Sequence, residues 1–85
     1  MPKSVFTDAN RVVVEELIAA RKAAGLRQQD LAERLGKPQS FISRIEGGQR
    51  RVDILEFYAI ARAMKADPAE LFGTIVGRLP RRFGI

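Results

Sequence analysis

Residues 28–45 decide the fold, and they read Gln28-Gln-Asp-Leu-Ala-Glu-Arg-Leu-Gly36-Lys-Pro-Gln-Ser-Phe-Ile-Ser-Arg-Ile45. Apolar residues recur three or four positions apart on both sides of Gly36, which predicts two short helices over residues 28–35 and 38–46. Gly36 can take the left-handed backbone conformation that ends the first helix. Pro38 suits the first position of the second helix, because its missing N–H costs nothing there.

A small residue stands where these two helices would cross. Ala32 lies four positions before Gly36, and Ile42 and Ile45 follow the turn at the spacing of a helix-turn-helix unit. Two steeply crossing helices need a small side chain at their contact, and the second helix needs apolar anchors that leave its opposite face free. Such a free face can enter the major groove of DNA.

Helical periodicity continues outside this unit and predicts further helices over about residues 8–24, 53–64 and 68–72. Asp8 can cap the first of them and Gly25 can end it. Signals for strands are nearly absent, so we expect an all-α fold, a compact bundle of about five helices. The helix over residues 53–64 contributes as candidate core residues Ile54, Phe57, Ile60, Ala61 and Met64.

The chain of 85 residues has room for one domain. We expect residues 1–72 to form this domain, with the helix-turn-helix motif at about 28–46. Residues 73–85 are expected to form an irregular C-terminal tail, since glycine and proline recur there.

The amino-acid inventory argues against most enzymatic chemistry. The chain has no Cys and no His, so it offers no disulfide, no thiolate nucleophile and no imidazole base or metal ligand. We therefore expect no enzyme activity, no cofactor and no metal. No apolar run approaches the roughly 18 residues that a membrane helix needs, so we expect a cytoplasmic protein with no membrane partner.

Positive charge is concentrated in the middle of the chain. Residues 21–51 contain eight basic and three acidic residues, whereas residues 1–20 and 52–72 are slightly acidic. A basic segment of this kind indicates a polyanionic partner such as nucleic acid. From charge alone, an ordinary solvated surface is the equal alternative.

Residues 14–72 resemble the Cro/CI-type (lambda-repressor-like, XRE) family of helix-turn-helix transcriptional regulators. The phrases that carry the resemblance are Gly25-Leu-Arg-Gln-Gln-Asp-Leu-Ala, Gln39-Ser-Phe-Ile-Ser-Arg-Ile-Glu-Gly47, Ala61-Arg-Ala-Met and Pro68-Ala-Glu-Leu-Phe72. The resemblance implies a lambda-repressor-like DNA-binding domain that regulates transcription. It also implies a homodimer that binds double-stranded DNA at a near-palindromic site.

The resemblance also implies roles for particular residues. Residues 38–46 match the recognition helix, and its base-contacting positions are Gln39, Ser40, Ser43 and Arg44. Glutamine can pair with adenine and arginine with guanine through two hydrogen bonds. Residues expected to contact phosphates are Arg27, Gln28, Lys37, Gln49, Arg50 and Arg51.

Arg21 and Glu46 match an ion pair of the family that has a structural role. Two positions depart from the family pattern. Arg27 stands where the family often has Thr, and Pro38 stands where it often has Ser or Thr.

Two alternatives to a stand-alone regulator stay open. The chain could be an antitoxin or controller-type protein whose main role is to bind another protein, in which case a neighbour protein would co-purify. It could also be an interaction module that has lost DNA binding, which a shallow salt dependence on DNA would indicate.

Overall fold

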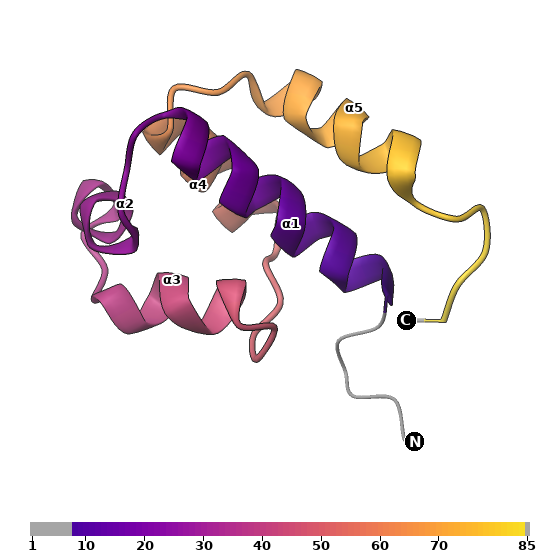
Figure 1. The fold of residues 1–85 in the computed structure, drawn as a ribbon, viewed down its shortest axis with the longest axis horizontal. Helices are drawn as coiled ribbons and strands as arrows, with labels where there is room; N and C mark the ends of the chain where they lie inside the picture. Colours follow the sequence, from indigo (N-terminus) through magenta and orange to yellow (C-terminus); the bar gives the residue numbers. More distant parts are fainter. Residues whose placement is uncertain (1–7, 85) are drawn as a thin grey trace.

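The computed structural model describes residues 8–84. In this range the chain forms five α-helices and no strand, which confirms the all-α prediction. Figure 1 shows the helices arranged as one bundle. Their bounds are α1 (Asp8–Ala23), α2 (Gln28–Leu35), α3 (Gln39–Glu46), α4 (Ile54–Ala63) and α5 (Pro68–Arg78).

The turn between α2 and α3 has the predicted left-handed glycine. Gly36 has φ 67° and ψ 32°, a conformation that a residue with a Cβ atom adopts at a cost. The N–H of Lys37 donates to the carbonyl oxygen of Ala32 at 3.0 Å, so the last turn of α2 is closed by a backbone hydrogen bond. Gly25 has φ 74° after α1 and ends that helix in the same way.

Asp8 and Pro38 have other roles at their helix starts than those predicted. Pro38 has ψ 156°, which is extended backbone, so it is the N-cap of α3 and the helix itself begins at Gln39. Asp8 is the first helical residue of α1 and not its cap, and its carboxylate accepts a hydrogen bond from Arg11 at 3.0 Å. The capping position of α1 lies outside the described residues.

The prediction of an irregular tail from Gly73 is wrong, because α5 continues to Arg78. Ile75 is buried in the core in the middle of this extension, and Leu79 packs against the same core. Arg78 donates to Glu16 at 2.8 Å and to Glu15 at 2.7 Å, which ties the end of α5 to α1. These tertiary contacts outweigh the weak helix propensity of glycine.

The core lies between all five helices. Ala32 is almost fully buried, as expected for the small residue of the predicted crossing, and α2 packs on α3. The prediction that Ile54 belongs to the core is wrong, since this residue is 69% exposed at the first position of α4. The core cluster consists of Leu17, Leu31, Ala32, Ile42, Ile45, Phe57, Ile60, Met64 and Ile75.

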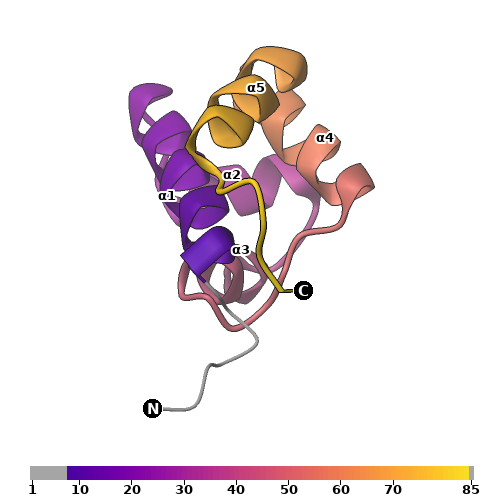
Figure 2. The ribbon, with the colours of Figure 1, turned by 90° about the vertical axis from the view of Figure 1, so that its right-hand side faces the viewer.

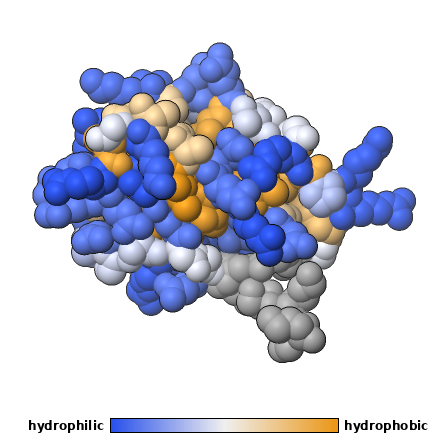
Figure 3. Space-filling view, viewed as in Figure 1, coloured by the Kyte–Doolittle hydropathy of each residue, from blue (hydrophilic) through white to orange (hydrophobic). Residues whose placement is uncertain are grey.

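The arrangement leaves α3 at one end of the molecule. In Figures 1 and 2, α3 lies at the lower edge and α5 at the upper edge, with α1 and α4 between them on opposite sides of Figure 2. On the face shown in Figure 3, hydrophilic residues cover most of the surface and hydrophobic residues show only in a broken band across the middle. No other described helix therefore covers the outer side of α3 in these views.

Candidate nucleic-acid interface

The outer face of α3 carries the residues predicted to contact bases. Gln39, Ser40 and Arg44 are exposed, and Ser43 is half-buried with its hydroxyl donating to the carbonyl oxygen of Ser40 at 3.3 Å. On the opposite side of the helix, Ile42 and Ile45 are each only 2% exposed. The buried isoleucines fix the rotation of α3, so its polar face points outward.

A buried ion pair anchors the C-terminal end of α3. Arg21 of α1 donates from Nε and Nη2 to the carboxylate of Glu46, at 2.7 and 2.9 Å. Its Nη1 donates to the carbonyl oxygen of Leu26 at 2.8 Å. This is the pair that the family resemblance implies, and it joins α1 to the end of the recognition helix through two parallel hydrogen bonds.

A chain of side-chain amides extends this anchor to the start of α3. Gln28 donates to Oε1 of Glu46 at 2.9 Å and accepts a hydrogen bond from Gln39 at 3.2 Å. Within residues 8–84, the second side-chain N–H of Gln28 and the side-chain carbonyl oxygen of Gln39 can bond other partners. The first residue of α2 therefore orients the first residue of α3.

Arg27, at the N-cap of α2, already has an acidic partner. Its guanidinium donates from Nε and Nη2 to Asp30 at 3.0 and 2.8 Å, and its backbone N–H donates to the same carboxylate at 2.8 Å. These hydrogen bonds hold the pKa of Asp30 down at about 2. The side chain of Arg27 is exposed, so its outer surface still faces solvent.

The other predicted phosphate contacts lie around α3. Lys37 is exposed directly before the helix, and its Nζ lies 5.3 Å from the centroid of the Phe41 ring. Gln49 and Arg51 are exposed in the connection between α3 and α4.

Arg50 is held more firmly than a free surface cation. Its guanidinium lies 4.8 Å from the ring centroid of Phe41, and it donates from Nη1 and Nη2 to Glu56 at 2.9 and 2.7 Å. The pKa of Glu56 is lowered to about 2, first by the hydrogen bonds from Arg50 and then by the backbone N–H of Asp53. Sequence reasoning missed both Phe41 and Glu56 as parts of this site.

One sequence signal could have pointed to Glu56. It stands three positions after Asp53, and in the structure the two residues form a reciprocal capping box at the start of α4. That pattern places a carboxylate beside the basic loop. Nothing in the sequence indicated that Arg50 would stack on Phe41, because the contact depends on how the loop folds back.

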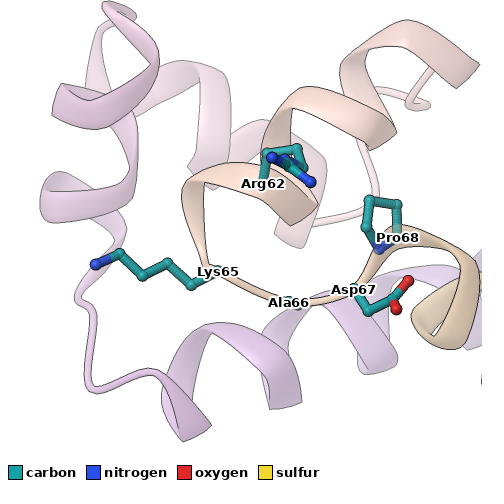
Figure 4. A pocket seen from close by; sticks show the side chains of 5 residues that line it. All are labelled: Arg62, Lys65, Ala66, Asp67 and Pro68. Atoms are coloured by element: carbon teal, nitrogen blue, oxygen red, sulfur yellow. The ribbon is translucent and has the colours of Figure 1, made fainter.

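Away from α3 the described residues offer little for ligand chemistry. A hollow where α4 passes into α5 is lined by Arg62, Lys65, Ala66, Asp67 and Pro68. In Figure 4 the side chain of Lys65 extends away from the others, so no polar groups converge there. Within residues 8–84, no acidic side chains group so that they could hold a metal ion, and no helix is long and apolar enough to cross a membrane.

The structure has two short helices joined by a glycine turn, and the second helix is anchored on one face and exposed on the other. This arrangement defines a DNA-binding protein of the helix-turn-helix class. Residues 17–71 match the model of the helix-turn-helix family. Because the match covers more than half of the chain, the chain belongs to this family, in its XRE-type branch.

Individual relatives agree with this assignment. An uncharacterized HTH-type transcriptional regulator of Sinorhizobium fredii (strain NBRC 101917 / NGR234), y4dJ, is 28% identical over 64 residues, which are 75% of this chain and 83% of that protein. An XRE-family like protein from Pseudomonas syringae pv. tomato str. DC3000 has a TM-score of 0.80 at 38% identity, covering 86% of this chain and 89% of that one.

A third similar protein is the restriction-modification controller protein C.AhdI from Aeromonas hydrophila. Its structure has a TM-score of 0.71 at 32% identity and covers 78% of this chain and 100% of that one. Together with the family match, these relatives show that the chain is a DNA-binding transcriptional regulator of the XRE type.

Proposed function

We propose that this regulator recognises a specific double-stranded DNA sequence in the cytoplasm by placing α3 in the major groove. The observation that carries the proposal is the division of α3 into a buried face, with Ile42 and Ile45, and an outward polar face. Arg44 is the exposed cation of that face and fits the O6 and N7 acceptors of guanine, and Gln39 fits adenine. Ser40 and Ser43 complete the base-contacting set.

Phosphate contacts would fix the position of α3 in the groove. The residues that we assign to them are the predicted ones, and all of them lie at the ends of α2 and α3 or in the loop after α3. They occupy the segment of residues 21–51, which holds eight of the fifteen basic residues of the chain. The set comprises Arg27, Gln28, Lys37, Gln49, Arg50 and Arg51.

We also propose that the protein binds as a homodimer, through the exposed side of α4. Ile54, Leu55 and Tyr58 are 69%, 77% and 54% exposed, which is unusual for three large apolar residues so close together. Figure 2 places α4 on one side of the molecule and α3 at its lower end. A two-fold contact through α4 would thus leave both recognition helices on one face, where they could enter grooves roughly 34 Å apart on a near-palindromic site.

The first test is in vitro selection from a random DNA pool. Fluorescence anisotropy at several salt concentrations would then compare the selected duplex with a scrambled duplex. We expect a near-palindromic sequence that binds at least 10³-fold more tightly than the scramble. We also expect affinity that falls steeply as salt rises, since bound phosphates release counterions.

The opposite outcome would be equal, weak binding to both duplexes with a shallow salt slope. That result would overturn sequence reading and favour the alternative in which the main partner is another protein. A pull-down with the purified chain would then identify that partner.

A controller-type role is a second candidate, favoured by the likeness to C.AhdI, which is a restriction-modification controller protein at 32% identity. In that role the chain would regulate the genes of a restriction–modification pair. The position of the selected sequence in the genome tests it. A site beside such genes supports the controller role, and sites only at unrelated promoters would contradict it.

A further inference from the structure

The guanidinium of Arg50 contacts three separate parts of the chain. It lies over the ring of Phe41 on α3, with 4.8 Å between the guanidinium carbon and the ring centroid. Its edge makes a two-pronged contact with Glu56 on α4, at 2.9 and 2.7 Å. Its Nη1 also donates to the carbonyl oxygen of Arg51, at 2.9 Å, within the connecting loop.

These contacts use the special shape of arginine. The planar guanidinium can stack on a ring and at the same time offer parallel donors to one carboxylate, whereas the ammonium group of lysine is a compact point charge that cannot do both. Three of the donor contacts of Arg50 are already made inside the protein. Arg50 is therefore only partly available to a phosphate.

Glu56 connects the same cluster to the start of α4. Its Oε1 accepts from the backbone N–H of Asp53 at 3.0 Å, and its own N–H donates to Asp53 at 2.7 Å. The carboxylate that holds Arg50 is thus fixed by the cap of α4. The loop of residues 47–53 is closed at one end by α3 and at the other by this cap.

We propose that Arg50 is a positioning residue, clamped between Phe41 and Glu56, whose role is to hold the loop of residues 47–53 in the shape that presents Gln49 and Arg51 to the DNA backbone. This inference rests on the proposed phosphate contacts of the loop. It changes the role first assigned to Arg50, because most of the effect of Arg50 on DNA binding would pass through its neighbours.

Glu56→Gln distinguishes a phosphate-contacting from a loop-positioning role of Arg50, because the two roles predict opposite changes in DNA affinity. Glutamine keeps the capping pattern at the start of α4 but removes the negative charge that holds Arg50. If Arg50 were an ordinary phosphate contact, this change would free its charge and tighten DNA binding. If Arg50 positions the loop, binding should weaken by about tenfold, the cost of ordering roughly one loop residue again on binding.

Arg50→Lys and Arg11→Lys form a matched pair that preserves charge, because Arg11 is an exposed arginine on α1 outside the proposed contacts. Arg50→Lys should weaken binding to the selected duplex almost as much as Arg50→Ala does, because lysine cannot reproduce the clamp. Arg11→Lys should stay within about twofold of the unaltered protein, since Arg11 takes no part in the proposed DNA contacts or in the clamp. Tighter or unchanged binding by Glu56→Gln, or near-normal binding by Arg50→Lys, would overturn the proposal.

A measurement without DNA keeps this test independent of the proposed function. Hydrogen exchange of the backbone amides of residues 48–53 should speed up several-fold in Arg50→Lys and Glu56→Gln, and not in Arg11→Lys. Amides of the buried part of α3 serve as an internal control for global unfolding. Unchanged loop exchange would refute the clamp even if the protein reads DNA. Faster loop exchange in a protein that selects no sequence would leave the clamp standing and refute only the sequence reading.

Discussion

Arg44 is the exposed cation on the outer face of α3, and within residues 8–84 it forms no ion pair that would neutralise it. We expect Arg44→Ala to cost roughly 1–3 kcal/mol of binding free energy on the selected duplex and to relax the preference at one base pair. Anisotropy titrations against duplexes altered at each position would measure both effects. An equal loss on every sequence, including the scramble, would show that Arg44 contacts phosphate and not a base.

Arg21 contributes to the stability of the fold through its buried ion pair with Glu46. Its side chain is 10% exposed and that of Glu46 is 7% exposed, so removing either one leaves a charge in a nearly dry place. We expect Arg21→Met to lower the free energy of unfolding by about 3 kcal/mol. Urea unfolding followed by circular dichroism would measure the change.

The double variant Arg21→Met with Glu46→Leu is the control for that prediction. Replacing both charges by apolar side chains of similar volume removes the unpaired charge, so much of the lost stability should return. If Arg21→Met alone were as stable as the unaltered protein, the anchoring role of the pair would be contradicted.

The helix starts of α2 and α4 carry the two carboxyl groups with lowered pKa, Asp30 and Glu56. A carboxyl group whose pKa is about 2 in the folded protein and about 4 in the unfolded chain stabilises the fold fully above about pH 5. This contribution is lost as the pH falls toward 2. We therefore expect the free energy of unfolding to decrease steadily from about pH 5 to about pH 2.

The Glu56→Gln variant tests how much of this loss of stability at low pH comes from the start of α4. Glutamine does not titrate, so the free energy of unfolding of the variant should fall less steeply with decreasing pH than that of the unaltered protein. The part of the decrease that is due to Asp30 should remain. Urea midpoints measured between pH 2.5 and pH 6 would show the difference. Identical pH dependence in the two proteins would mean that Glu56 makes no ion pair in solution.

On the scale of the whole molecule, the exposed apolar side of α4 is expected to control assembly. Leu55 is 77% exposed in the single chain, so Leu55→Glu should change the stability of the monomer by no more than about 0.5 kcal/mol. Burying a carboxylate in an apolar contact is costly, so the dimer should dissociate. Sedimentation equilibrium would measure the mass, and anisotropy the accompanying loss of affinity for the palindromic duplex.

Ala19→Glu is the matched control, because Ala19 is also exposed on a helix but lies on α1, away from α4. It adds the same charge and should leave both mass and affinity nearly unchanged. If Leu55→Glu stayed dimeric, the dimer contact would lie elsewhere on the surface.

The sequence by itself determined the helix-turn-helix unit. Apolar spacing around Gly36 and the conformational freedom of glycine are local properties, so they predicted α2, the turn and α3 to within one residue. The same local pattern predicted that Ile42 and Ile45 are buried and that Gln39 and Arg44 face outward. The roles of these outward residues in reading bases stay predictions.

Only the tertiary structure decided which residues far apart in sequence meet. Ile54 is exposed although it fits the apolar pattern of α4, because none of the described helices packs against its side of α4. Helix α5 runs on to Arg78 because Ile75 is buried in the core and Arg78 pairs with carboxylates 62 and 63 residues earlier, on α1. Arg50 likewise depends on a ring and a carboxylate supplied by two different helices. Local propensity reflects only neighbours within about one helical turn, whereas burial and ion pairing depend on the packing of the whole chain.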